Sequence, residues 1–94
     1  MTERYLIVIE KCNNNYGAYS PDVLGCIATG DSIEETIENM RSAIAFHLDG
    51  MSEDGEQLPE PQPIAKHLMQ DDFELNIKND LLTFVEVELP LLVA

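Results

Sequence analysis

The most constraining feature of this sequence is a short run near its start that is apolar on both sides of a strand. The segment "RYLIVIEK" (4–11) is rich in aromatic and β-branched residues, which favour strands. Side chains of a strand alternate between the two faces of a sheet, so the unbroken apolar run from Tyr5 to Ile9 places apolar groups on both. We therefore expect this strand in the middle of a sheet, with at least one face well covered.

A helix over residues 33–49 is the clearest local prediction. Ser32 is a good N-cap residue, and Glu35, three positions later, completes a capping box. Gly50 is placed to end the helix. The apolar positions recur at spacings of three and four and are Ile33, Ile37, Met40, Ile44 and Leu48. This stripe predicts that the helix covers one face of the sheet.

Two shorter strands are expected between the first strand and the helix. The segments 16–20 and 25–30 have strand character, and the Pro21-Asp22 pair breaks the run between them, because proline removes a ladder donor and aspartate favours a turn. The second segment, "GCIATG", consists mostly of small residues. Small side chains predict that a helix or another backbone approaches closely there.

The second half of the chain contains a proline-rich crossover and one more strand. Prolines at 59, 61 and 63 predict that residues 52–63 are extended and stiff, and residues 64–70 are a candidate short helix. Residues 82–90 alternate, with Phe84 on one side and Val85 and Val87 on the other. The expected order is β-β-β-α-β, an α+β fold in one domain (1–94), with variable residues 52–81 before the last strand. A helix between strands favours a last strand parallel to the first.

The charge of the chain limits its partners. Eighteen acidic residues against five basic ones leave a net charge of −13. Phosphate backbones are bound through Lys and Arg, so neither nucleic acid nor an anionic membrane is expected as a ligand of this chain alone. A basic protein would be attracted, although acidity also serves solubility alone. Two cysteines without a CxxC pattern, and no signal or membrane segment, predict a reducing, cytoplasmic setting.

No catalytic constellation stands out in the sequence. Asp22, Asp31 and Glu10 are candidates for a metal cluster, but a turn, a helix start and a strand end explain them without a metal. The histidines, His47 and His67, have no nucleophile at a telling spacing, and His67 is expected on a short polar, mobile helix. Cys26 is expected in the core. We therefore expect no enzyme activity, no metal and no cofactor.

Four segments together carry a family resemblance. They are "YLIVIEK", "YGAYSPDVLGCIATGDSIEETIENMRSAIAFHLDG", "GEQLPEP" and "FVEVELP". Their aromatic hairpin, Pro-Asp-x-x-Gly-Cys corner, Thr-Gly-Asp-Ser helix start and Val-x-Val strand resemble the HicB family of antitoxins and related stand-alone HicB-like proteins. The resemblance covers residues 5–61 and 82–90, whereas 62–81 match poorly.

This resemblance implies a fold and a partner. The implied fold is a partial ribonuclease H-like β-β-β-α-β sheet without the catalytic set. The implied partner is a small basic RNA-cleaving toxin of the HicA type, which HicB blocks by covering its active surface. Family members often carry a C-terminal DNA-binding module, but only residues 91–94 follow the last predicted strand, so we expect no separate DNA-binding domain. The alternative is a stand-alone HicB-like oligomer with a structural or ligand-binding role and no toxin.

Two groups of residues are candidates for contacts with other proteins. Aromatic side chains beside a turn can anchor a partner, although both tyrosines can equally pack on the sheet. The partner-binding candidates are Tyr16, Tyr19, Pro21, Asp22 and Leu24. We expect the last strand at the sheet edge, where residues 83–89 pair with a second copy to form a dimer or larger homo-oligomer. The self-association candidates are Phe84, Val85, Val87 and Leu89.

Overall fold

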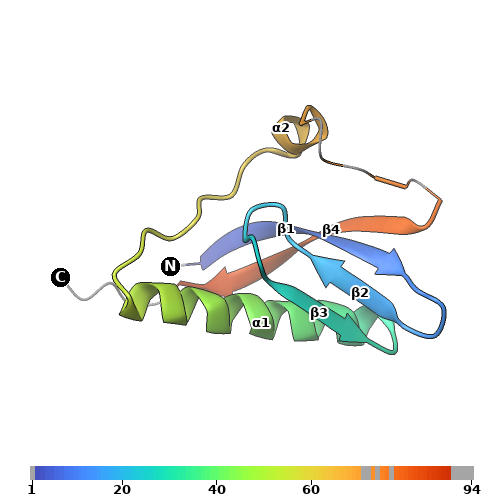
Figure 1. The fold of residues 1–94 in the computed structure, drawn as a ribbon, viewed down its shortest axis with the longest axis horizontal. Coiled ribbons are helices and arrows are strands. Elements are labelled where there is room, and N and C mark those ends of the chain that lie inside the picture. Colours follow the sequence, from blue (N-terminus) through green and yellow to red (C-terminus); the bar gives the residue numbers. More distant parts are fainter. Residues whose placement is uncertain (1, 71–72, 74, 77, 90–94) are drawn as a thin grey trace.

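The protein is a four-stranded antiparallel sheet with a long helix on one face, as seen in a computed structural model that describes residues 2–70, 73, 75, 76 and 78–89 (Figure 1). The elements in chain order are β1 (Thr2–Lys11), β2 (Tyr16–Tyr19), β3 (Ile27–Gly30), α1 (Ile33–Glu53), α2 (Ile64–Leu68) and β4 (Asp80–Glu88). The spatial order of the strands is β3-β2-β1-β4. The expected α+β fold with one main helix is confirmed.

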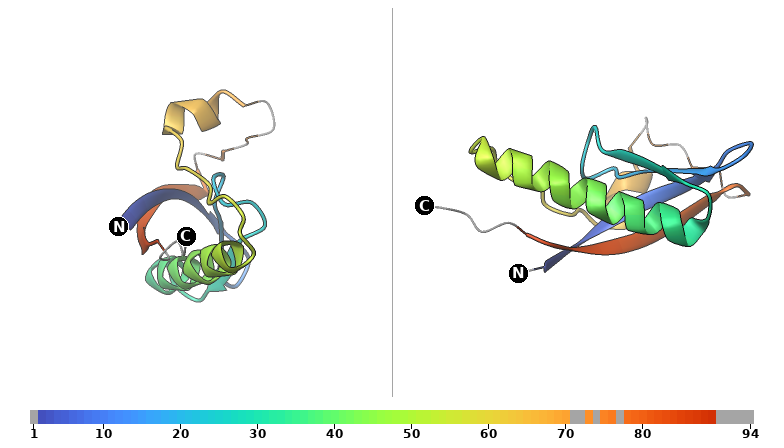
Figure 2. Two further views of the ribbon diagram at one scale, coloured as in Figure 1. Left: turned by 90° about the vertical axis from the view of Figure 1, so that its left-hand side faces the viewer. Right: turned by 90° about the horizontal axis from the view of Figure 1, so that it is seen from below.

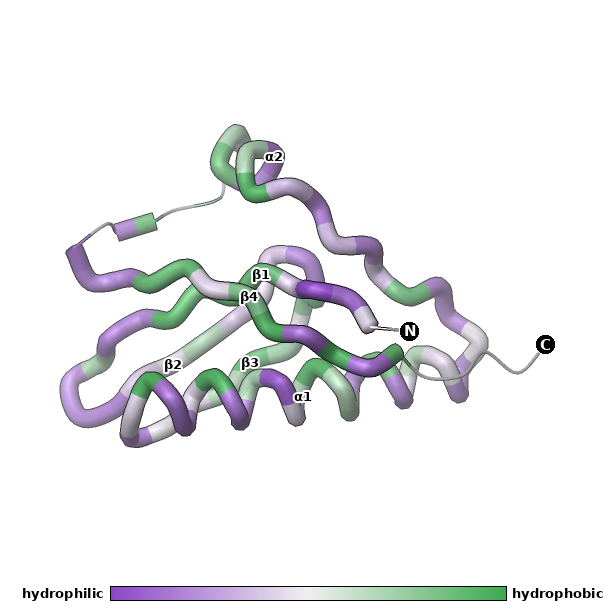
Figure 3. The backbone as a smooth tube through the Cα atoms, turned by 180° about the vertical axis from the view of Figure 1, so that it is seen from behind, coloured by the Kyte–Doolittle hydropathy of each residue, from purple (hydrophilic) through white to green (hydrophobic). Residues whose placement is uncertain are grey.

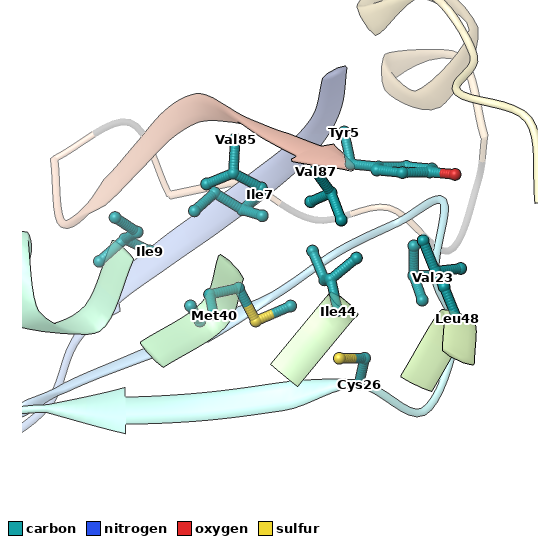
Figure 4. Close-up of a cluster of buried hydrophobic side chains, with 11 residues drawn as sticks. Tyr5, Ile7, Ile9, Val23, Cys26, Met40, Ile44, Leu48, Val85 and Val87 are labelled. Atoms are coloured by element: carbon teal, nitrogen blue, oxygen red, sulfur yellow. The ribbon is translucent and has the colours of Figure 1, made fainter. Parts of the chain in front are cut away.

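The first strand occupies the centre, as its sequence requires. All five residues from Tyr5 to Ile9 are buried. Tyr5, Ile7 and Ile9 join the core beneath α1, where their side chains and those of β4 meet the helix (Figure 4). The other face of the sheet carries Leu6 and Val8, and α2 lies on that side (Figure 2). Because both faces are occupied, the strand can be apolar throughout.

The helix packs through its apolar stripe. Ser32 is the N-cap, and its Oγ accepts a hydrogen bond from the Glu35 backbone N at 3.0 Å. Met40, Ile44 and Leu48 are fully buried, and the hydropathy of α1 alternates along its turns (Figure 3). Burying each such side chain is worth roughly 1.5–3 kcal/mol. The helix therefore attaches to the sheet by the residues that the periodicity predicted.

The helix end differs from the prediction. Gly50 lies inside the helix, which continues to Glu53. Gly55 makes the stop, because it adopts a positive φ of 73°. The Glu56 backbone N then donates to the Met51 carbonyl at 2.9 Å and the Gly55 N to the Ser52 carbonyl at 3.1 Å. This pair of bonds is a Schellman motif, which satisfies two carbonyls at the helix end.

The direction of the last strand was also predicted wrongly. β4 pairs with β1 in antiparallel register, with Leu6 opposite Phe84 and Tyr5 opposite Val85. The prediction took a helix between two strands as the sign of a parallel pair. In the structure, α1 runs back along the sheet, and the proline-rich segment after it runs in the opposite direction to α2 before β4 begins (Figure 1). Because the chain passes along the sheet once more before β4, this strand runs antiparallel to β1.

Candidate partner-binding surface

The corner (residues 20–26) connects β2 to β3. The buried Ser20 Oγ accepts hydrogen bonds from the backbone N atoms of Asp22, at 3.2 Å, and Val23, at 3.3 Å. Val23 is inserted into the core, and Gly25 adopts a positive φ of 83° that an L side chain would resist. The corner is thus fixed from inside, while Leu24 between these anchors is 80% exposed.

Asp22 faces inward. Its carboxylate is only 1% exposed, and Oδ1 accepts from the Gln62 backbone N at 3.0 Å. The same oxygen lies 2.8 Å from Nε2 of His67, on α2. The structure therefore gives the Asp22 side chain an internal role that links the corner to the crossover. A direct contact of this carboxylate with a partner would require these bonds to break.

His67 differs from its sequence-based interpretation. It was expected on a polar, mobile helix, but its side chain is 5% exposed and bound to Asp22. Sequence reasoning missed both His67 and Gln62 as members of this site. The nearest signal is the three-residue spacing of Ile64 and His67, the two less exposed positions of α2. Nothing local identifies Asp22, 45 residues away, as the acceptor.

The two tyrosines lie on opposite faces of β2. Tyr16 packs against the core beneath α1, whereas Tyr19 pairs with Val8 on the other face. Burial, and to a smaller extent Glu10 and Asp80, raises the pKa of the Tyr19 hydroxyl. The five partner-binding candidates therefore do not share one surface. Leu24 is exposed, Pro21 is half-buried beside it, and Tyr16 is turned toward the helix.

A small cavity lies beneath the corner. It measures about 220 Å³, is open to solvent on one side and is lined by three segments that are distant in sequence. Its lining residues are Asp22, Val23, Leu24, His47, Met51 and Pro59. Pro59 also accepts, through its carbonyl, a 2.8 Å hydrogen bond from the Tyr5 hydroxyl. The crossover is thus held against β1 at Pro59 and against the corner at Gln62 and His67.

The two edges of the sheet are unequal. On β3, Nδ2 of Asn39 from α1 donates to the Thr29 carbonyl at 2.8 Å, which occupies an acceptor of that strand. On the opposite side, β4 is an edge strand, as predicted, and within the described residues no strand pairs with its outer side. An open edge is a template for another strand.

The self-association candidates divide between the two faces of β4. Val85 and Val87 are 1% and 2% exposed and pack under α1, so a neighbouring strand would meet only their backbone. Leu89 is half-buried against the same core. Phe84 lies on the other face, with the Arg4 guanidinium carbon 4.5 Å from its ring centroid. Of the four, Phe84 presents the most exposed side chain.

Apart from the contact between Asp22 and His67, the described part of the chain does not gather the candidates for metal binding. Among the described residues, no three His, Cys, Asp or Glu side chains gather closely enough to hold a metal ion. Cys26 is buried, and burial raises the pKa of its thiol, which disfavours the reactive thiolate. No helix in the described part of the chain is long and apolar enough to cross a membrane.

Comparisons with known proteins agree with this fold. Residues 5–93 match a family described as the HicB-like antitoxin of bacterial toxin–antitoxin systems. An uncharacterised 14.9 kDa protein from the rep–hol intergenic region of Haemophilus phage HP1 is 41% identical over 85 residues, which are 90% of this chain and 61% of the phage protein. This chain therefore spans less than two thirds of the length of that relative.

Two solved structures are similar over nearly the whole chain. The N-terminal domain of antitoxin HicB from Burkholderia pseudomallei has a TM-score of 0.73 and 24% identity, covering 93% of this chain and 100% of that one. A chain of a HicA3–HicB3 toxin–antitoxin complex has a TM-score of 0.73 and 29% identity, covering 92% and 99%. By its sequence match and its fold, this chain belongs to the family of HicB-like antitoxins of bacterial toxin–antitoxin systems.

Proposed function

We propose that this protein neutralises a small basic RNA-cleaving toxin of the HicA type by direct contact in the cytoplasm, with no bond-making chemistry and no cofactor of its own. The observation that carries the proposal is its likeness to a chain solved in a HicA3–HicB3 complex. Membership of the HicB-like family supports the same role.

The charge supplies a physical reason for the contact. An enzyme that cleaves RNA needs Lys and Arg to hold the phosphate backbone. A protein with a net charge of −13 is attracted to such a surface and can place carboxylates where phosphates would lie. The attraction acts at long range and raises the association rate. An antitoxin of this kind can therefore compete with RNA for the toxin.

The corner is the contact that we propose for the toxin. Leu24 projects from a corner fixed by Ser20, Val23 and Gly25, so it can dock without losing much conformational freedom. Pro21 and Tyr19 lie beside it in the chain. Asp22 then acts by supporting this surface from inside, whereas Tyr16 lies at the other end of β2, opposite Lys11.

We also propose that the outer edge of β4 pairs with a second copy of the chain. Strand addition satisfies backbone donors and acceptors that otherwise face water. On the β3 side, Asn39 already occupies the Thr29 carbonyl. The open edge at β4 is therefore the one suited to a homodimer.

The experiment for toxin binding is co-expression with the product of the neighbouring gene. We expect a stable complex of defined mass by native mass spectrometry, and relief of the growth arrest caused by that product alone. A soluble, folded protein that neither binds nor protects against any small basic protein encoded beside it would overturn the proposal. That outcome would leave the stand-alone oligomer as the better description.

The contact surface has its own matched test. Leu24→Arg adds a positive charge at the corner, and Phe46→Arg adds the same charge on the outer face of α1, where Phe46 is 82% exposed. Both side chains lie in water, so both variants should fold. We expect Leu24→Arg to weaken toxin affinity at least tenfold, about 1.4 kcal/mol, and Phe46→Arg to change it less than twofold. Equal losses would place the contact elsewhere.

A further inference from the structure

The crossover is attached to the corner through one oxygen atom. We call residues 60–69, which include α2, the strap. Among the described residues, every hydrogen bond from the strap to the sheet or to the corner ends on Asp22 Oδ1, which receives the Gln62 backbone N and lies 2.8 Å from His67 Nε2. α2 stands directly over the corner in the fold (Figures 1 and 2).

The strap has little structure of its own to hold it there. Its other hydrogen bonds are local, such as those from the Lys66 backbone N to the Pro63 carbonyl and from Met69 to Ala65. α2 has five residues, far fewer than the dozen or so that an isolated helix needs in water. The Tyr5–Pro59 hydrogen bond holds the chain just before the strap, and beyond it the position of the strap depends on the contacts of Asp22 with Gln62 and His67, which we call the joint.

The joint is only partly satisfied. Asp22 Oδ2 and His67 Nδ1 are both buried without a hydrogen-bond partner among the described residues. Buried polar atoms without partners are uncommon, and their lost hydration opposes the closed state. Opening the joint would break two hydrogen bonds but would return these two atoms to water. The closed and open states of the strap are thus closer in free energy than two buried hydrogen bonds would suggest.

We infer that Asp22 is a positioning residue, whose carboxylate holds the strap as a releasable element that opens while the sheet and α1 stay folded. In the closed state His67 is bound to the corner that carries Leu24, and the next two residues of the strap are Leu68, the last residue of α2, and Met69. The side chains of Leu24, Leu68 and Met69 are exposed apolar groups, and together they form a docking surface for the basic toxin. The docking part rests on the proposed function, whereas the release of the strap does not.

Amide hydrogen exchange of the free protein tests the strap. In Asp22→Ala and in His67→Ala, residues 62–69 should exchange at least tenfold faster, while Tyr5 to Ile9 and the buried turns of α1 keep their protection. The effects of the two substitutions on the exchange rate should not add in the double variant, because each substitution breaks the same joint. Asp31→Ala is the matched control, since it removes an equal charge from an exposed position.

Two results would overturn the inference. Unchanged exchange of the strap in both single variants would show that other contacts hold it. Loss of protection throughout the molecule in both would show that the pair belongs to the global core. If Asp22→Ala fails to fold, His67→Ala alone carries the test, and residues 62–69 should still exchange at least tenfold faster while the rest of the molecule keeps its protection.

Toxin binding separates the inference from the proposed function. Asp22→Ala should weaken toxin affinity and loosen the strap together, whereas Leu24→Arg should weaken affinity and leave exchange of the strap unchanged. Asp22→Ala that loosens the strap with full toxin affinity would overturn the docking surface. If the unaltered protein binds no toxin, the proposed function fails, and the exchange experiment still decides whether Asp22 holds the strap.

Discussion

At the scale of single residues, the end of β3 approaches the first turn of α1 so closely that only glycine fits at Gly30. Gly30 is buried, and a Cβ atom built on it would lie 2.5 Å from Thr36 Oγ1 and 2.7 Å from the Thr36 backbone N. Thr36 is itself fixed, because its hydroxyl donates to the Ser32 carbonyl at 2.7 Å. The small residues of the strand predicted this close approach, and the structure confirms it at Gly30.

Gly30→Ala should destabilise the protein by about 2–3 kcal/mol, since the added methyl group meets backbone atoms that cannot move aside without shifting the helix. Gly17→Ala in β2 is the control, because its Cβ would meet only ordinary contacts, at 3.8 Å from Cys12 Sγ and 4.0 Å from the Ala28 carbonyl. Urea unfolding of the two variants measures the difference. Equal midpoints would contradict the close approach.

At the scale of elements, two glycines near the end of α1 have different tasks. Gly50 is helical and has open space where a side chain would go, whereas Gly55 has a φ of 73° and closes the helix. Glycine after the apolar stripe of a helix predicts the helix end, and both Gly50 and Gly55 satisfy that pattern. The last apolar contacts of the helix extend its length to Glu53, because Met51 packs against the core.

Gly50→Ala should raise the free energy of unfolding by about 0.5–1 kcal/mol, because glycine in a helix interior costs that much relative to alanine. Gly55→Ala should lower it by about 1–2 kcal/mol, since alanine resists the left-handed conformation. Thermal unfolding followed by circular dichroism distinguishes the pair. A stabilising Gly55→Ala would show that the helix does not end in the Schellman motif.

At the scale of the whole molecule, charge acts in opposite directions on the two associations that we propose. A net charge of −13 attracts a basic toxin but repels a second copy of the chain. At about 0.1 M salt, exposed charges are screened beyond roughly 10 Å. Added salt should therefore weaken toxin binding and strengthen pairing at the β4 edge.

Sedimentation of the free protein in low and high salt tests the predicted effect of salt on pairing at the β4 edge. The dimer fraction should rise with salt. Phe84→Glu, on the exposed face of β4, should reduce the dimer, whereas Phe46→Glu adds the same charge on the outer face of α1 and should reduce it much less. A dimer that dissociates in salt, or that responds more to Phe46→Glu, would contradict pairing at β4.

The sequence by itself determined the features that depend on residues close together in the chain. The apolar run of Tyr5 to Ile9 required a central strand, Ser32 with Glu35 marked the helix start, and alternation in the last strand separated Val85 and Val87 from Phe84. Each of these three features rests on a local periodicity of the sequence or on a local hydrogen bond. Such patterns carry their physical cause within a few residues, so they can be read before the fold is known.

Only the tertiary structure decided the direction of β4, the role of Asp22 and the burial of His67. The strand direction depends on where the chain goes between α1 and β4, and an extended, proline-rich segment has no period that records its path. The Asp22–His67 joint unites residues 45 positions apart, and each of them alone has an ordinary local explanation. Their partnership exists because the folded chain brings them together away from water, where a carboxylate must find a donor.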